Sequence, residues 1–173
     1  MSVTSGSSTP HLIHALASEA DRNPIARKLI VVPTFGMGRE LLRRLSLERI
    51  GWAGFEIMTP HTLALQLARL GLDRESLRTL DAFEQQSLLD EALDLCISSG
   101  DAALGNLSEG VGFREKVYGA VSALRMAGIE ASALESARLT TLSKRLFLLQ
   151  MLNHYERLLY ERRQADSALI FQL

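Results

Sequence analysis

The pattern of apolar and polar positions predicts that the chain begins with alternating helices and strands. Residues 28–33, Lys-Leu-Ile-Val-Val-Pro, show no polar alternation after the lysine, as in a strand that is covered on both faces. A second short strand is predicted at residues 55–58. Apolar residues at helical spacing precede, separate and follow these strands, in residues 9–20, 40–50 and 60–70. This order of elements favours a parallel sheet.

Gly71 is predicted to end the third of these helices, and the rest of the chain has a helical pattern. Asp81, with Glu84 three residues later, has the form of a capping box and begins an amphipathic helix. Another helix is expected over residues 113–128, where Gly128 closes it. Residues 142–159 are apolar on two sides, which is typical of a helix in the centre of a bundle.

Asp166 is predicted to cap one more helix, which begins at Ser167. The sequence ends at Leu173, after about two turns of that helix. We therefore expect the 173 residues to be part of a longer protein.

Composition and charge exclude several classes of protein. A hydrophobic content of 47% and a charged content of 23% are ordinary for a globular domain. The formal net charge of -1 provides no overall attraction to nucleic acid or membrane, so such binding would need a local patch. The single cysteine, Cys96, excludes an internal disulfide. No apolar run approaches the roughly 20 residues that cross a bilayer, and we expect a cytoplasmic protein without a membrane partner.

Residues 5–11, Ser-Gly-Ser-Ser-Thr-Pro-His, stand where a nucleotide-binding fold would place its phosphate loop. A working loop has the form G-x-x-x-x-G-K-[ST], whose lysine and hydroxyl serve the phosphates and Mg²⁺. This segment lacks the lysine and the second glycine, so Gly6, Ser7, Ser8 and Thr9 are a degenerate nucleotide-binding candidate. The alternatives are a flexible terminus with a helix cap, or a residual anion-binding helix terminus. We expect no cofactor.

Five segments carry a resemblance to a known family. They are Leu29–Pro33 with the turn Thr34-Phe35-Gly36-Met37-Gly38-Arg39-Glu40-Leu41-Leu42, then Phe55-Glu56-Ile57-Met58-Thr59-Pro60-His61-Thr62-Leu63-Ala64, Leu80–Leu89, Phe113–Ile129 and Leu149–Asp166. In kind and order they resemble the start of an AddB-type helicase–nuclease subunit. The resemblance spans nearly the whole chain and rests on the order of the segments.

This resemblance implies a UvrD-like superfamily 1 helicase layout and an α/β fold class. Residues 1–74 would be an incomplete RecA-like parallel-sheet part, 75–165 an all-helical insertion, and 166–173 the start of a return to the core. Because the phosphate loop is degenerate, the resemblance points to the inactivated-helicase branch, and we expect this part to be no enzyme. It also implies an AddA-like partner subunit and a nuclease domain further along the full-length protein.

Thr34, Phe35, Gly36 and Arg39 follow the first strand, at the edge where open α/β sheets place ligands. The resemblance implies that this segment contacts single-stranded DNA. A hydroxyl, backbone amides and an arginine can bind phosphate, and Phe35 could stack on a base. The alternative is a tight turn with Phe35 in the core.

Thr59, His61 and Thr62 resemble the second DNA-contacting motif of those helicases. The alternative is a helix cap, in which Thr59 accepts from backbone amides and Pro60 takes the first helical position. The two roles are compatible.

Arg39, Arg43, Arg44 and Arg49 form a basic stripe on the predicted helix of residues 40–50. Glu40 can pair with Arg44 at i,i+4 spacing, which favours a solvated face without a ligand. His11 and His14 have a metal-ligand spacing, but no cysteine or carboxylate cluster joins them, so no metal is expected. No catalytic arrangement of side chains is predicted.

We therefore expect a non-enzymatic part of an inactivated helicase-like subunit in double-strand-break repair and recombination. It would act as a scaffold and DNA-guiding surface while a partner supplies ATP-driven motion. The second hypothesis is a protein-interaction module, in which residues 75–165 bind a partner subunit without contacting DNA. A third, an independent ATPase, conflicts with the missing lysine.

Overall fold

The computed structural model describes residues 9–48, 53–98, 112–136 and 142–173. The chain divides into two compact units, Met1–Gln66 and Leu67–Leu173, and each is described by itself. Helix α3, Pro60–Glu75, begins in the first unit and ends in the second.

The first unit has two helices and a parallel pair of strands. Its elements, in chain order, are α1 (Thr9–Arg22), β1 (Lys28–Val31), α2 (Phe35–Leu47) and β2 (Phe55–Met58), followed by the start of α3. Strands β1 and β2 pair in parallel, with Lys28 opposite Phe55 and Val31 opposite Met58. The predicted parallel pairing is confirmed, and the strand predicted at 55–58 has the predicted bounds.

The core of the first unit lies on one face of this sheet. Its apolar side chains come from α1, α2 and the inward positions of both strands: Ile13, Ala17, Ile30, Val32, Leu41, Leu42, Leu45, Phe55 and Ile57. On the same face, Lys28 is buried, with its ammonium 5.1 Å from the centre of the Phe55 ring and bonded to the carbonyl oxygens of Ala26 and Ala53. The side chain of Lys28 therefore borders the core at the start of β1.

The prediction that residues 28–33 are covered on both faces is wrong for this chain. Leu29 and Val31, on the face away from the core, are 45% and 47% exposed. Helices α1 and α2 contribute to the same core, so among the described residues of the first unit the other face of the sheet has no helix packed on it.

The second unit is a helical bundle with a very short second sheet. After α3 come β3 (Arg78–Thr79), α4 (Ala82–Ser98), α6 (Phe113–Met126), α7 (Ala131–Ser136), α8 (Leu142–Glu161), β4 (Gln164–Ala165) and α9 (Ser167–Gln172). Strands β3 and β4 pair in parallel, with Arg78 opposite Gln164. The two-residue strands and α7 were not predicted from the sequence.

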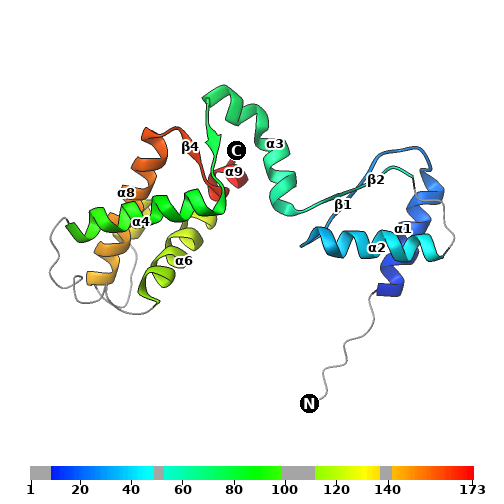
Figure 1. The fold of residues 1–173 in the computed structure, drawn as a ribbon, viewed down its shortest axis with the longest axis horizontal. Coiled ribbons are helices and arrows are strands. Elements are labelled where there is room, and N and C mark those ends of the chain that lie inside the picture. Colours follow the sequence, from blue (N-terminus) through cyan, green and yellow to red (C-terminus); the bar gives the residue numbers. More distant parts are fainter. Residues whose placement is uncertain (1–8, 49–52, 99–111, 137–141) are drawn as a thin grey trace, which may run out of the picture. The chain divides into compact units, whose positions relative to one another are not determined.

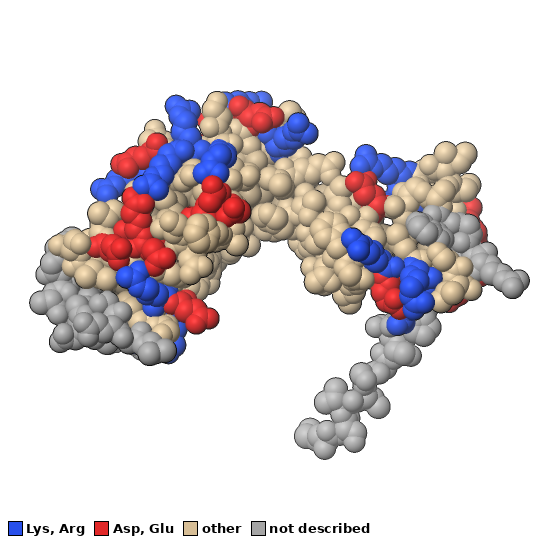
Figure 2. All heavy atoms as spheres, viewed as in Figure 1, with Lys and Arg blue, Asp and Glu red and all other residues tan. Residues whose placement is uncertain are grey.

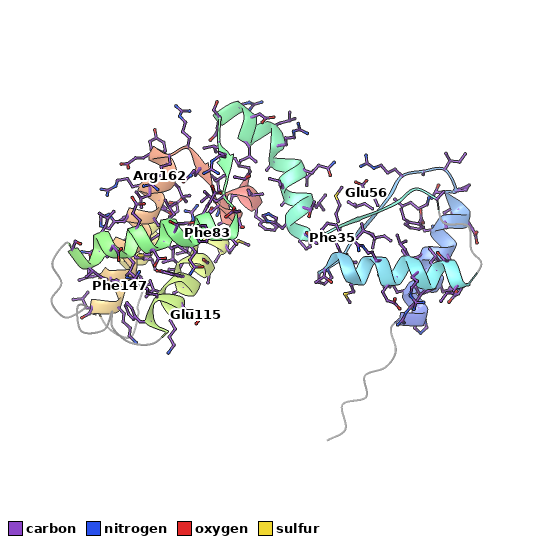
Figure 3. The ribbon with its side chains drawn as sticks, viewed as in Figure 1. Phe35, Glu56, Phe83, Glu115, Phe147 and Arg162 are labelled. Atoms are coloured by element: carbon purple, nitrogen blue, oxygen red, sulfur yellow. The ribbon has the colours of Figure 1, made fainter. Side chains whose placement is uncertain are left out.

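Helix α8 is central to the core of the second unit, as its two apolar sides predict (Figure 1). The buried side chains include Leu93, Cys96, Val121, Met151, Leu152 and Tyr155, from α4, α6 and α8. Phe147 of α8 packs its ring 6.1 Å from that of Phe113, between centroids, and Figure 3 shows Phe147 among the helices of this unit. Cys96 is fully buried in this core.

The predicted end of α3 at Gly71 is wrong, because the helix continues to Glu75. Gly71 lies beside the side chain of Leu173, and the next residue, Leu72, is buried in the unit. The helix ends instead at Ser76, whose φ of 54° is in the left-handed region. Burial of Leu72 explains why the helix continues past Gly71, although the local sequence pattern predicts that the helix ends there.

The predicted start of the second helix at residue 40 is also wrong, because α2 already begins at Phe35, where the hydroxyl of Thr34 caps it. Two other termini follow their sequence signals. The backbone N–H of Asp81 donates to Oε2 of Glu84 at 3.0 Å, and that of Glu84 donates to Oδ1 of Asp81 at 2.8 Å, which confirms the capping box. The N–H of Leu169 donates to Oδ1 of Asp166 at 3.0 Å, so Asp166 caps α9 as predicted. Within the described residues, no helix is both long enough and apolar enough to cross a membrane.

Candidate nucleic-acid interface

Two helix amino ends meet the same edge of the first unit's sheet. Because β1 and β2 are parallel, their carboxyl ends lie at the same edge of the sheet, and a helix follows each strand there (Figure 1). The N–H of Val32 still donates to the carbonyl oxygen of Met58 at 2.9 Å, so the strands remain paired up to this edge. The partial positive charges of two helix termini are therefore gathered at one edge.

Thr34 caps the first of these helices, α2. Its backbone is extended, with φ -140° and ψ 148°, and its hydroxyl accepts from the N–H of Met37 at 3.3 Å. The N–H of Gly38 donates to the carbonyl oxygen of Thr34 at 3.3 Å, the first bond of the helix. One of the free amides of this helix end is thus satisfied by the cap, while others remain available to an anion.

Thr59 caps the second helix, α3, which begins at Pro60 as predicted. Its hydroxyl oxygen accepts from the N–H of Thr62 at 3.2 Å and lies 2.7 Å from the hydroxyl oxygen of Thr62. The predicted cap is therefore confirmed, and Thr62 is part of it. His61 is exposed on the first turn of α3.

The alternative interpretation placed Phe35 in the core, but Phe35 does not lie there. It is 47% exposed at the amino end of α2, where Figure 3 labels it. Met37, which the sequence analysis did not single out, is 55% exposed on the same turn. Apolar residues that follow a strand and begin a helix can be recognised in a sequence, but only the structure shows that these two face solvent.

The basic stripe of α2 is largely neutralised by one carboxylate. Glu40 accepts from Arg43 at 2.8 and 2.9 Å and from Nε of Arg44 at 2.8 Å. Hydrogen bonds from Arg43 and then Arg44 lower the pKa of Glu40 to about 2, so its charge persists throughout the physiological range. The guanidinium of Arg39 is exposed and has no ion pair or hydrogen bond to any described residue. Among the described arginines of this stripe, Arg39 is therefore the one left to meet an anion.

The structure leaves part of the predicted sites undescribed. Gly6, Ser7 and Ser8 lie outside the described residues, as does Arg49, and Thr9 is described only as the first residue of α1. His11 and His14 are both exposed on α1. Across the part of the chain that the structure describes, no three His, Cys, Asp or Glu side chains come together as a metal site.

In the second unit, charged side chains are arranged in opposed pairs. Arg114 donates to Asp94 at 3.1 Å and also to Asp90, which in turn accepts from the hydroxyl of Tyr118. Arg162 likewise pairs with Glu91. Figure 2 shows blue and red spheres interleaved over the described residues of this unit, which therefore form no extended surface of one sign on the face in view.

Compared with known proteins, the chain matches no family model, and no curated protein matches it.

Proposed function

We propose that this chain is the N-terminal part of an AddB-like, inactivated superfamily 1 helicase subunit that guides single-stranded DNA. In this proposal the first unit is the beginning of a RecA-like domain, and the second is its helical insertion. The whole complex would act in double-strand-break repair and recombination, with ATP-driven motion supplied by an AddA-like partner subunit.

One observation carries the proposal: the capped amino ends of α2 and α3 lie at one sheet edge, with exposed Phe35 and with Arg39, which pairs with no described residue. Free backbone amides and Arg39 suit phosphate oxygens, and an exposed aromatic ring suits an unstacked base. Because a stacked duplex hides its base faces, this combination favours a single strand. The sheet edge itself is where open α/β folds place ligands.

The inactivated state is supported by the sequence around the start of α1. Residues 5–11 lack the lysine that neutralises the terminal phosphates of a nucleotide. Titration calorimetry with a non-hydrolysable ATP analogue and Mg²⁺ tests this part of the proposal. We expect no heat of binding, and clear micromolar affinity would contradict an inactivated helicase.

DNA binding is tested by fluorescence anisotropy of a labelled oligothymidylate at low salt, repeated at rising salt. We expect binding that weakens with salt, because each neutralised phosphate releases a counterion. Arg39→Glu should abolish it. Arg22→Glu is the matched control, since it reverses the same charge on α1, away from the two capped ends. Equal effects of the two variants, or no binding by the parent chain, would contradict a DNA-guiding surface at this edge.

A second candidate function, binding of a partner subunit without DNA contact, is favoured by the surface of the second unit. A groove of about 720 Å³ lies between α4 and α6, lined by Gln85, Gln86, Leu89, Arg114, Tyr118 and Ser122. Phe83, on the first turn of α4, is 80% exposed (Figure 3). Exposed aromatic side chains are frequent anchors of protein interfaces.

This alternative is tested by sedimentation of the chain with a purified AddA-type subunit. If the exposed first turn of α4 binds that subunit, Phe83→Ser weakens the complex, while Arg39→Glu does not. Tyr160→Ser is the control, because Tyr160 is similarly exposed, at 85%, but belongs to α8. Association that Arg39→Glu and Phe83→Ser disturb equally would contradict a dedicated partner surface.

A further inference from the structure

Gly38 stands at an unfavourable place for a glycine, in the fourth position of α2. Glycine is among the poorest residues in a helix interior, because it loses the most backbone freedom on folding. A glycine at such a position therefore needs a local reason. Its φ is not in the left-handed region, so the reason is not backbone conformation.

The reason is the close approach of α2 to β2. Gly38 is buried, and a Cβ atom at this position would overlap Cγ2 of Ile57 and lie 3.1 Å from its Cγ1 and Cδ1. Gly38 shares the core-facing side of α2 with Leu41, Leu42 and Leu45, and it is the member of that row nearest the amino end. The contact with Ile57 therefore sets how near the amino end of α2 comes to the sheet.

Each residue of this contact is close in sequence to one of the two capping residues. Gly38 is four residues after Thr34 and bonds to its carbonyl oxygen, while Ile57 is two residues before Thr59. A side chain at position 38 would push α2 from β2 by on the order of 1 Å to restore carbon–carbon contacts of about 3.5–4.0 Å. Such a shift moves the Thr34 helix end relative to the Thr59 helix end.

We infer that Gly38 is a positioning residue, which fixes the spacing of the two helix amino ends so that both contact one nucleic-acid strand. This inference rests on the proposed function. Gly38 itself has no side chain to offer a ligand; it acts through the placement of Thr34 and Arg39 with respect to Thr59.

The test compares oligothymidylate affinity of the 173-residue chain and its variants at low salt. Gly38→Ala is expected to bind roughly tenfold more weakly, as on losing one charge-assisted phosphate contact. Ile57→Ala removes the three atoms that the new Cβ would meet, so Gly38→Ala/Ile57→Ala should recover the parent affinity. Gly119→Ala is the matched control, because Gly119 lies within α6 and has nothing within 4 Å of an added Cβ.

Each outcome decides the inference. Recovery of affinity in the double variant supports spacing when circular dichroism shows that Gly38→Ala folds like the parent chain, because the loss of affinity then comes from the placement of the helix ends and not from unfolding. If Gly38→Ala binds like the parent, the inference is wrong and the proposed function stands. Circular dichroism shows whether Gly38→Ala folds. If it does not, the affinity of the double variant tests the inference instead. A double variant that folds but binds weakly overturns the inference. Absence of binding by the parent chain overturns the proposed function together with it.

Discussion

Arg125 and Asp166, which are 41 residues apart, form a two-bond ion pair inside the second unit. Nε of Arg125 donates to Oδ2 of Asp166 at 2.7 Å, and Nη2 donates to Oδ1 at 3.1 Å. The side chains are 11% and 2% exposed. Asp166 also caps α9, and Arg125 reaches Glu156 of α8 at 2.8 Å. The pair thus ties the end of α6 to α8 and to the start of α9.

Replacing Arg125 by Met should lower the free energy of unfolding by about 3–5 kcal/mol, because the buried Asp166 carboxylate loses its counter-charge. Urea denaturation followed by circular dichroism measures this. Arg157→Met is the control, since Arg157 pairs with Glu161 while both are more than half exposed, and it should change stability by less than about 1 kcal/mol. Similar losses for both variants would show that burial of the Arg125 pair adds nothing.

Tyr155 predicts a loss of stability at alkaline pH. Burial chiefly, and then the charge of Asp166, raise the pKa of Tyr155 far above its ordinary value of about 10. As the pH rises past 10, the unfolded chain therefore releases this proton while the folded chain keeps it. The stabilisation is complete below pH 10, and above it the free energy of unfolding falls by about 1.4 kcal/mol per pH unit.

The measurement is the free energy of unfolding between pH 9 and 11, by urea denaturation. Tyr155→Phe removes the titrating hydroxyl and should make the decline less steep, while the part that comes from the buried thiol of Cys96, whose pKa is also raised, remains. Tyr160→Phe, at an 85% exposed position, should leave it unchanged. A decline of equal slope in the parent and in Tyr155→Phe would contradict the assignment.

Cys96 should be nearly inert in the folded chain. It is fully buried, and burial raises the pKa of its thiol to about 11. Because alkylation needs both access and the thiolate, iodoacetamide at pH 8 should react about 100-fold or more slowly with the folded chain than in guanidinium. Mass spectrometry is unambiguous here, since the chain has one cysteine. Comparable rates in the two conditions would mean that this part of the core opens readily.

The features that the sequence predicted are those that depend on neighbouring residues. The capping box of Asp81 and Glu84, the Thr59 cap before Pro60 and the Asp166 cap all join residues three apart, and all three are present. Helix caps follow from such spacing because a side-chain oxygen reaches only the amides of the next turn. The strand β2 was also predicted with its correct bounds, from a short local run at residues 55–58.

Features that join distant residues were beyond local patterns. Nothing near Gly71 indicates that Leu72 is buried or that Leu173 lies beside the glycine. The pairing of Arg78 with Gln164 joins two strands of two residues each, too short to show any alternation. The prediction that both faces of β1 are covered was wrong, because an apolar run does not indicate which helices pack on the strand. For the candidate site, the sequence supplied the residues, and the structure showed that Phe35 and Arg39 are exposed.

Glu40 predicts how the candidate interface responds to one lost charge. Glu40 holds both Arg43 and Arg44, so Glu40→Gln leaves two guanidiniums on α2 without their carboxylate. If nucleic acid follows this helix beyond Arg39, the variant should bind oligothymidylate more tightly at low salt. The slope of log affinity against log salt should also steepen by about 0.7 for each added phosphate contact.

The control for this variant is Glu19→Gln, which removes the same charge from α1, where Glu19 pairs with Arg22. A general effect of net charge would raise the affinity of both variants equally, because each substitution makes the net charge of the chain more positive by one. A rise confined to Glu40→Gln would instead assign the added contacts to Arg43 and Arg44. An unchanged slope in Glu40→Gln would limit the interface to the amino end of α2, where Thr34 and Arg39 lie.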